Sequence, residues 1–154
     1  MKILNLILIL GVCIMAKAEL SKSGTLGSFV GAKENFSGKV KVDMLFKENE
    51  WRNFSGALVE FEPKARSAWH THPAGQSLIV TQGEIISASE DGQVWLAKKG
   101  DVLSCPPNIK HWHGGSDLGG AHLALTGSKE GEAVKWLELV SDEEYEAALK
   151  KLKS

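Results

Sequence analysis

Two histidine-rich stretches far apart in the chain most strongly constrain what this sequence can fold into. The first holds His70 and His72, and the second holds His111 and His113. Successive residues of a β-strand point to opposite faces, so the two members of each pair project to the same side of a regular strand. Such a pair is often no more than two ordinary strand histidines. The alternative is that such a pair forms the start of a transition-metal site, because neutral imidazole nitrogens suit Mn, Fe, Ni, Cu and Zn.

The spacing around both stretches follows a recognisable frame. Three residues separate His72 from Gln76, and six separate Gln76 from Gly83. Gly100 is followed after five residues by Pro106, and the next histidine comes five places later. In this spacing the sequence resembles the cupin family, whose two motifs are G-x5-H-x-H-x3,4-E-x6-G and G-x5-P-x-G-x2-H-x3-N. The resemblance places the metal ligands at His70, His72, Gln76 and His111.

Four positions depart from the cupin motifs. Lys64 and Asn108 stand where the motifs have glycine, and Gly115 replaces the closing asparagine. These changes concern turn geometry, and asparagine adopts left-handed backbone angles more readily than most residues. The fourth change, Gln76 in place of glutamate, alters the chemistry. Three imidazoles and one amide carry no charge, so a bound divalent ion would keep its full charge for Lewis-acid catalysis.

Several sequence segments resemble a narrower group within the cupin family. Positions 65–73 (ARSAWHTHP), 75–81 (GQSLIVT) and 110–114 (KHWHG) look like small bacterial cupins that include manganese-dependent hydroxynitrile lyases. The resemblance implies a divalent metal, Mn2+ first, with Fe2+, Ni2+ or Zn2+ as alternatives. It implies cleavage of a cyanohydrin, a small hydroxy compound, into a carbonyl compound and cyanide. It also implies pocket walls at Ala57, Val59 and Thr126.

Two further histidines need a role. His122 shares strand parity with Ala124 and Thr126, which the resemblance places in the pocket, so His122 is the candidate general base. The alternative is a satisfied core histidine. His113 could be an extra ligand, but the motif register selects His111, so we expect His113 to contact the pocket or support the ligands.

Other residues near the motifs have plainer interpretations. Trp69 and Trp112 flank the ligands and should point away from the metal, into packing or a subunit interface. Arg66 could attract an anionic substrate or lie solvated in a loop. Cys105 is expected to be a buried, inert thiol.

The N-terminus has the layout of a secretory signal. Lys2 precedes an apolar run from Ile3 to Met15, and a small-x-small cleavage site ends at Ala18. The run is too short to span a bilayer, which argues against a membrane anchor. Lipid attachment at Cys13 is a weaker alternative. We therefore expect cleavage after Ala18 and an exported protein, periplasmic or secreted, with no stable membrane association.

The remaining chain reads as one all-β domain. Residues 19–39 are expected to form an N-terminal arm, and residues 40–154 a cupin domain with a C-terminal helix opened by a Ser141–Glu144 capping box. Short strands are expected at 40–44, 57–61, 78–80 and 121–126, with a hairpin turning at Asp91-Gly92. Turns or loops are expected at 82–84 and 114–117. Many short strands and one helix predict a closed or double-sheet β-barrel, the cupin double-stranded β-helix or jelly roll.

Composition limits the function classes. The chain has no basic stripe, so nucleic-acid binding is not expected. We expect a small-molecule substrate and a homodimer or homotetramer. Two functions besides cyanohydrin cleavage remain open on the same ligands: a metal-dependent dioxygenase and a non-catalytic, exported cupin that binds a small ligand.

Overall fold

The strands form where the sequence alternates apolar and polar residues. In the computed structural model, which describes residues 17–153, Val40 and Val42 are buried while Lys41 between them is exposed. Val59 and Phe61 are likewise buried on either side of exposed Glu60. This alternation confirms the first two expected strands. Residues 1–16, which hold most of the predicted signal, lie outside the described part of the chain.

The structure contains many short strands, two long strands and one helix. The elements are β1 (Ser28–Val30), β2 (Phe36–Ser37), β3 (Val40–Phe46), β4 (Phe54–Phe61), β5 (Arg66–Ser67), β6 (His70–Thr71), β7 (Gln76–Ser89), β8 (Val94–Lys98), β9 (Val102–Cys105), β10 (His111–Gly127), β11 (Lys135–Trp136) and α1 (Asp142–Lys151). Within residues 17–153, no helix has the length and apolar character that a bilayer crossing requires.

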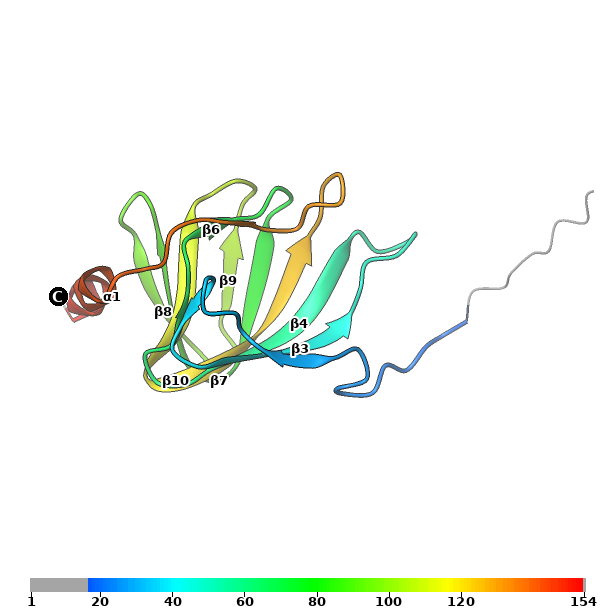
Figure 1. The fold of residues 1–154 in the computed structure, drawn as a ribbon, viewed down its shortest axis with the longest axis horizontal. Coiled ribbons are helices and arrows are strands. Elements are labelled where there is room, and N and C mark those ends of the chain that lie inside the picture. Colours follow the sequence, from blue (N-terminus) through cyan, green and yellow to red (C-terminus); the bar gives the residue numbers. More distant parts are fainter. Residues whose placement is uncertain (1–16, 154) are drawn as a thin grey trace, which may run out of the picture.

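The two long strands organise the sheet. β10 pairs antiparallel with β7 along most of its length, and its second half also pairs with β4. β3 and β1 continue the sheet beyond β4, while β8 and β9 both pair with β7. The sheet curls around a central space, and α1 lies outside it (Figure 1). The inner side holds an apolar core formed by Val40, Val42, Val59, Phe61, Ala65, Leu78, Val80, Ile85, Ala97 and Ala124.

Two of the predicted chain breaks are wrong, because both long strands bend at these positions and continue. The turn expected at 82–84 lies inside β7, and the loop expected at 114–117 lies inside β10. The pairing register shifts between Gly115 and Gly120, as it does at a β-bulge. Gly83 has φ +62°, and a Cβ there would lie 2.4 Å from the carbonyl oxygen of Gly119. Glycine at these positions therefore lets the two strands stay paired around the bend.

Both non-glycine residues at motif glycine positions keep the backbone that glycine would adopt. Lys64 and Asn108 each have φ 64°. The left-handed region is accessible to asparagine and less favourable for lysine. The turn geometry of the motifs is thus retained in spite of the substitutions.

The N-terminal arm takes part in the sheet. Its first described residues are exposed, but β1 pairs antiparallel with β3. β2 pairs with β5, next to the first histidine-rich stretch. The arm therefore reaches the barrel at two places.

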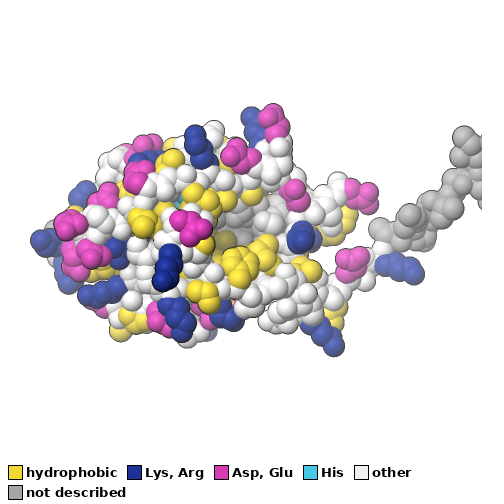
Figure 2. Space-filling model, viewed as in Figure 1, with side chains coloured by type: hydrophobic (Ala, Val, Ile, Leu, Met, Phe, Trp, Pro, Cys, Tyr) yellow, Lys and Arg dark blue, Asp and Glu magenta, His cyan; other side chains and the backbone are white. Residues whose placement is uncertain are grey.

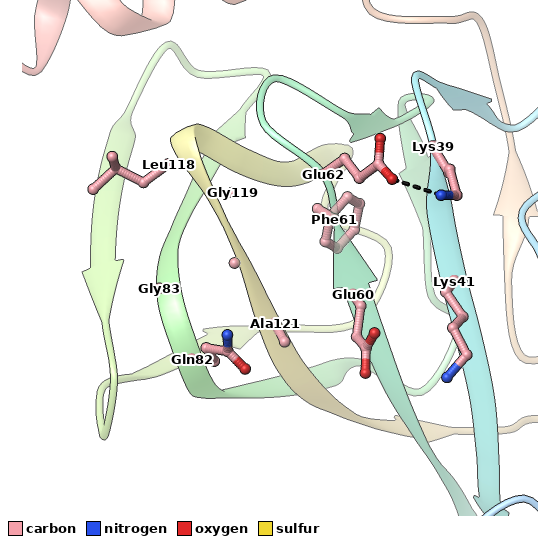
Figure 3. A pocket seen from close by; sticks show the side chains of 11 residues that line it. Lys39, Lys41, Glu60, Phe61, Glu62, Gln82, Gly83, Leu118, Gly119 and Ala121 are labelled. Carbon is pink, nitrogen blue, oxygen red and sulfur yellow. Dashed lines mark ion pairs between the residues drawn. The ribbon is translucent and has the colours of Figure 1, made fainter.

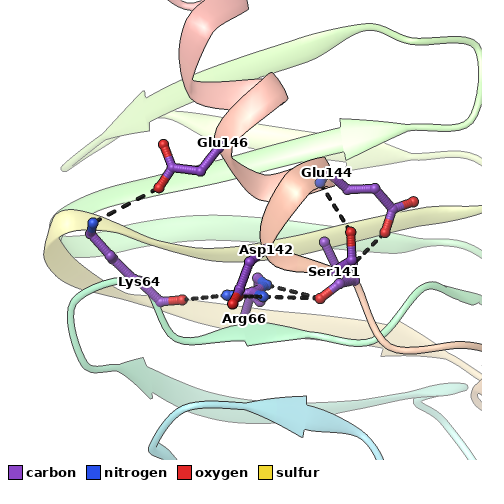
Figure 4. Close-up of polar contacts among 7 residues, drawn as sticks. Lys64, Arg66, Ser141, Asp142, Glu144 and Glu146 are labelled. Atoms are coloured by element: carbon purple, nitrogen blue, oxygen red, sulfur yellow. Dashed lines mark hydrogen bonds and ion pairs between the residues drawn. The ribbon is translucent and has the colours of Figure 1, made fainter.

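Helix α1 begins with the expected capping box. The Ser141 hydroxyl accepts from the Glu144 backbone N–H, and the Glu144 carboxylate accepts from the Ser141 backbone N–H (Figure 4). The helix buries Tyr145 and Ala148 in an apolar cluster with Trp112. Trp112 therefore points away from the barrel interior, as expected for a packing residue.

Arg66 joins the helix to the barrel, which differs from both roles expected for it. Its guanidinium donates from Nε and Nη2 to the Val140 carbonyl oxygen, at 3.1 and 3.0 Å. Nη2 also lies 2.6 Å from Asp142 Oδ1 (Figure 4). The guanidinium carbon lies 5.1 Å from the centre of the Tyr145 ring, within cation–π range. Arg66 is buried, so it is available neither to a substrate nor to solvent.

The visible surface mixes charges of both signs. On the face shown in Figure 2, acidic and basic side chains are interspersed, and apolar side chains gather beside a hollow. Figures 1 and 2 share one viewing direction, so the hollow faces the viewer over the region that the strands enclose.

We expect Arg66→Met to lower the free energy of unfolding by about 1–3 kcal/mol, because the buried Val140 carbonyl loses its donors. Chemical denaturation of the purified protein measures the change. Lys64→Met is the matched control, since the Lys64 side chain forms exposed ion pairs with Asp117 and Glu146, worth about 0–1 kcal/mol. Its backbone carbonyl, which accepts from Arg66 Nη1, is unchanged by the substitution. Equal losses in the two variants would contradict an anchoring role for Arg66.

Candidate metal centre

All five histidines of the chain gather inside the barrel, and all are buried. The ring centres of His70 and His72 lie 4.9 Å apart, and those of His70 and His111 lie 4.3 Å apart. His113 lies 5.1 Å from His70 on one side and 4.7 Å from His122 on the other. The two histidine-rich stretches therefore meet, as the sequence predicted.

Strand pairing explains why the rings meet. His70 of β6 is the direct antiparallel partner of His111 of β10, so their side chains project from the same face. His113 follows two residues along β10 on that face, opposite Ser87 of β7. His122 lies past the bend in β10, opposite Val59 of β4.

Three of the rings are oriented by backbone carbonyl groups. His70 Nδ1 lies 2.8 Å from the Ala68 oxygen, and His111 Nδ1 lies 3.0 Å from the Ile109 oxygen. His72 Nδ1 lies 2.6 Å from the oxygen of Ala133, far along the chain. A carbonyl oxygen only accepts, so each Nδ1 carries the proton and each Nε2 keeps its lone pair. Metal-binding histidines are commonly held in this way.

Gln76 presents an oxygen to the same region. Its Nε2 donates to Thr126 Oγ1 at 2.9 Å, and the side chain is buried. Its Oε1 has no hydrogen-bond partner within residues 17–153. The amide is thus paired at one end and open at the other.

These donors fit a divalent metal ion. Buried polar atoms are nearly always hydrogen-bonded, yet the Nε2 atoms of His72 and His111 and Oε1 of Gln76 are buried and unpaired among the described residues. Unpaired acceptors that converge from separate segments of the chain would be satisfied by a cation. His70, the remaining ligand predicted from sequence, has its Nδ1 bonded to Ala68 and contacts the other rings.

The geometry also brings His113 into the group. One ring nitrogen from each of His70, His111 and His113 lies within 4.8 Å of the others, which is close enough for a shared ion. His72 is not part of that tighter set, although its ring centre is 5.5 Å from that of His111. Four imidazoles and one amide therefore surround the centre.

Burial keeps the imidazoles neutral. Loss of solvation lowers the pKa of His111 to about 4 and that of His122 to about 3. Burial is also the largest cause that lowers the pKa of His70, His72 and His113. Neutral imidazoles have the lone pairs that metal binding requires.

A cavity of ≈ 380 Å³, here called cavity A, opens on one side of the centre. His70, His72, Gln76 and His113 line it at the metal side. All four residues predicted for the pocket line it: Ala57, Val59, His113 and Thr126. Within residues 17–153, no Asp, Glu, Lys or Arg side chain lines cavity A, and its three histidines are neutral.

Part of the wall of cavity A was not predicted from the sequence. Phe29 and Val30 of the N-terminal arm and Trp136 of β11 contribute to it. The sequence offered no signal for the two arm residues.

His122 lies behind His113 as seen from cavity A. It is fully buried and does not line the cavity, and its Nε2 lies 3.1 Å from His113 Nδ1. The two rings form a hydrogen-bonded pair in which His113 faces the cavity. Any proton exchange between His122 and a ligand in cavity A therefore passes through His113.

Cys105 lies on the other side of His111. Its Sγ is 3.1 Å from His111 Nδ1, and it lines a second cavity of ≈ 440 Å³ beside β8 and β9. Burial raises the pKa of the thiol to about 11, so it stays protonated. Cys105 is half-buried and not fully buried as expected, while the raised pKa of its thiol agrees with the inert character expected from sequence.

A groove of ≈ 300 Å³ on the outside of the barrel carries charged groups but no histidine (Figure 3). Lys39 pairs with Glu62 at 2.7 Å, and Lys41 pairs with Asp43 at 2.7 Å. The charges of the two lysines are thus compensated within the protein. This groove therefore contributes no residue to the histidine cluster inside the barrel.

Fold and site together define a β-barrel protein with a buried, uncharged donor set that could hold a divalent metal ion. The chain belongs to the cupin family: the profile of the cupin domain matches residues 57–121. A relative, (R)-mandelonitrile lyase of Granulicella tundricola, is 43% identical over 128 residues, which cover 82% of this chain and 98% of the relative.

Solved structures agree with this assignment. A cupin-like protein from Thermotoga maritima is 36% identical with a TM-score of 0.74, and the match covers 85% of this chain and 97% of that one. A cupin-2 domain from Rhodospirillum rubrum is 14% identical with a TM-score of 0.63, covering 90% and 93% of the two chains. The second likeness concerns the fold alone. The predicted cupin double-stranded β-helix with its C-terminal helix is confirmed.

We expect His70→Ala, His72→Ala and His111→Ala each to lose bound metal, because each removes an inward-facing Nε2. His113→Ala should retain metal, since the motif register assigns ligation to His111. Elemental analysis of the purified variants measures occupancy, and His113→Ala serves as the matched control. Full occupancy in His72→Ala with loss in His113→Ala would exchange the roles of these two residues.

We also expect metal-free protein to lose stability as pH falls from 6.5 towards 5. The unfolded chain takes up protons on its histidines below about pH 6.5. The folded chain does not, because burial lowers their pKa values, to about 4 for His111 and about 3 for His122. Each such histidine lowers the free energy of unfolding by an amount that rises from about 0.7 kcal/mol per pH unit at pH 6.5 to about 1.3 kcal/mol per pH unit near pH 5. Urea denaturation at pH 7.5, 6.0 and 5.5 tests this, and a constant midpoint would contradict it.

Proposed function

We propose that this protein is a metal-dependent lyase that cleaves a small, uncharged cyanohydrin into a carbonyl compound and hydrogen cyanide. The observation that carries the proposal is the set of buried, unpaired acceptors on His72, His111 and Gln76 beside an uncharged cavity. The 43% identical relative is named (R)-mandelonitrile lyase, which supports the same reaction class.

The donor set suits Lewis-acid chemistry. His70, His72, His111 and Gln76 would hold the ion, and none of them brings a negative charge. When bound, a divalent ion such as Mn2+ would polarise the hydroxyl oxygen of the substrate. The outward Nδ1–H bonds to the carbonyl groups of Ala68, Ala133 and Ile109 keep the rings in place for this.

Cavity A selects an uncharged ligand. Its wall is made of small or apolar side chains such as Val42, Ala57 and Val59, together with hydroxyl and amide groups. Away from the ion, an acidic group of a ligand would lose its hydration without gaining a Lys or Arg side chain among the described residues, which is unfavourable. A neutral aryl or alkyl cyanohydrin meets no such penalty.

The His113–His122 pair provides a path for the proton of the substrate hydroxyl. His113 faces cavity A, and its Nδ1 is bonded to His122 Nε2 at 3.1 Å. Both rings are neutral at pH 7, because burial lowers their pKa values. The pair can take up a proton on the cavity side at His113 and share it with His122, so His122 acts as base through His113.

The charge at position 76 tests this function. We expect Gln76→Glu to retain metal but to cleave mandelonitrile more slowly, about tenfold for each ~1.4 kcal/mol of lost transition-state stabilisation. The reason is that a carboxylate cancels one positive charge beside the reacting oxygen. Benzaldehyde release by the manganese-loaded protein, followed in ultraviolet absorbance, measures the rate.

Gln82→Glu is the matched control. It makes the same chemical change on β7, in the groove outside the barrel, and should leave the rate unchanged. Equal rates in Gln76→Glu and the parent would refute the charge argument. Failure of the loaded parent to release benzaldehyde would remove the lyase function, and oxygen uptake with a substrate would support a dioxygenase instead.

A further inference from the structure

We propose that Thr126 is a positioning residue of the metal centre, which acts by holding the amide of Gln76 with its oxygen towards the imidazoles. The inference rests on the proposed function only in taking Gln76 as a metal ligand. Thr126 itself touches neither the ion nor the reacting atoms in this role.

The strand register brings the two residues together. Thr126 of β10 is the direct antiparallel partner of Gln76 of β7, so both side chains project from the same face into cavity A. Gln76 Nε2 donates to Thr126 Oγ1 at 2.9 Å. Oε1 of the same amide is buried and has no partner within residues 17–153. The hydrogen bond to Thr126 thus fixes the orientation of the Gln76 amide, with Nε2 paired and Oε1 free to bind a cation.

The contact matters because an amide has a donor end and an acceptor end. If Oε1 binds a cation, the buried Nε2–H group must find an acceptor elsewhere, and Thr126 Oγ1 supplies it. Without the hydroxyl, the amide can turn its NH2 group towards the centre, where the unpaired Nε2 atoms of His72 and His111 would accept from it. Metal binding would then have to undo that pairing.

A positioning role for Thr126 predicts a specific pattern of metal affinities. Thr126→Val keeps the shape of the side chain but removes the oxygen, and it should weaken Mn2+ binding by roughly 10-fold, the lower end for supporting residues of metal sites. Thr126→Ser keeps the oxygen and should restore affinity close to that of the parent. A residue that merely packs against the strand would not show this rescue by serine.

Thr81→Val is the matched control. Thr81 also lies on the pair β7 and β10, where its hydroxyl donates to the Ala121 carbonyl oxygen at 3.2 Å, away from cavity A. The same chemical change there should leave Mn2+ affinity unchanged. A loss as large as that of Thr126→Val would show a general effect on the sheet and overturn the proposal.

The decisive test is a double-mutant cycle read by calorimetric titration of metal-stripped protein with MnCl2. In a Gln76→Ala background, Thr126→Val should cause no further loss of affinity, because Thr126 acts through Gln76. Unchanged affinity in Thr126→Val, or an equal loss in both backgrounds, would overturn the proposal. Circular dichroism checks folding, and Thr126→Ala replaces the valine variant if that variant does not fold.

The readout separates this inference from the proposed function. Metal affinity is measured without substrate, so a protein that shows the full Thr126 pattern but releases no aldehyde would retain the positioning role and lose the lyase function. A protein that cleaves cyanohydrin but lacks the Thr126 pattern would retain the lyase function and lose the positioning role of Thr126.

Discussion

Burial of neutral imidazoles whose inner nitrogens stay unpaired is the constraint on which the rest of this structure depends. Each ring must be stripped of water, which lowers its pKa, and each must be held so that one nitrogen faces the others. The Nδ1–H bonds to backbone carbonyl groups achieve the second requirement without adding charge. A carboxylate partner would have oriented the rings equally well, but it would have raised their pKa values and made the site less positive with an ion bound.

The barrel supplies the geometry that these bonds require. The long strands β7 and β10 stay paired around a bend because glycine at 83 and 119 allows a close crossing. The same two strands carry Gln76, His111 and His113, so their continuity sets the distances across the site. On the outer side, α1 covers Trp112, and Arg66 anchors the helix through its contact with Asp142. Residues far from the cavity thus support the alternation that places the histidines inside.

This design has a cost in the metal-free protein. Buried acceptors without partners reduce folding stability at any pH, and histidines that cannot be protonated reduce it further below pH 6.5. A bound cation would satisfy the acceptors, and its binding free energy would add to the stability of the folded state. Metal binding and folding stability would therefore be coupled at the same atoms.

The sequence by itself determined the local features. Alternating residues in 40–44 and 57–61, the Asp91-Gly92 hairpin and the Ser141 capping box each depend on residues close together in the sequence, and all were predicted. His70 and His111 also belong here, because each ring bonds to the carbonyl two residues before it. Tertiary structure decided the rest: that the strands pass unbroken through 82–84 and 114–117, that Arg66 anchors a helix, and that His113 stands between His122 and the cavity. It also oriented His72, through the carbonyl of distant Ala133. These outcomes depend on which strands pair across the barrel, and the two-residue period of a single strand carries no information about its partners.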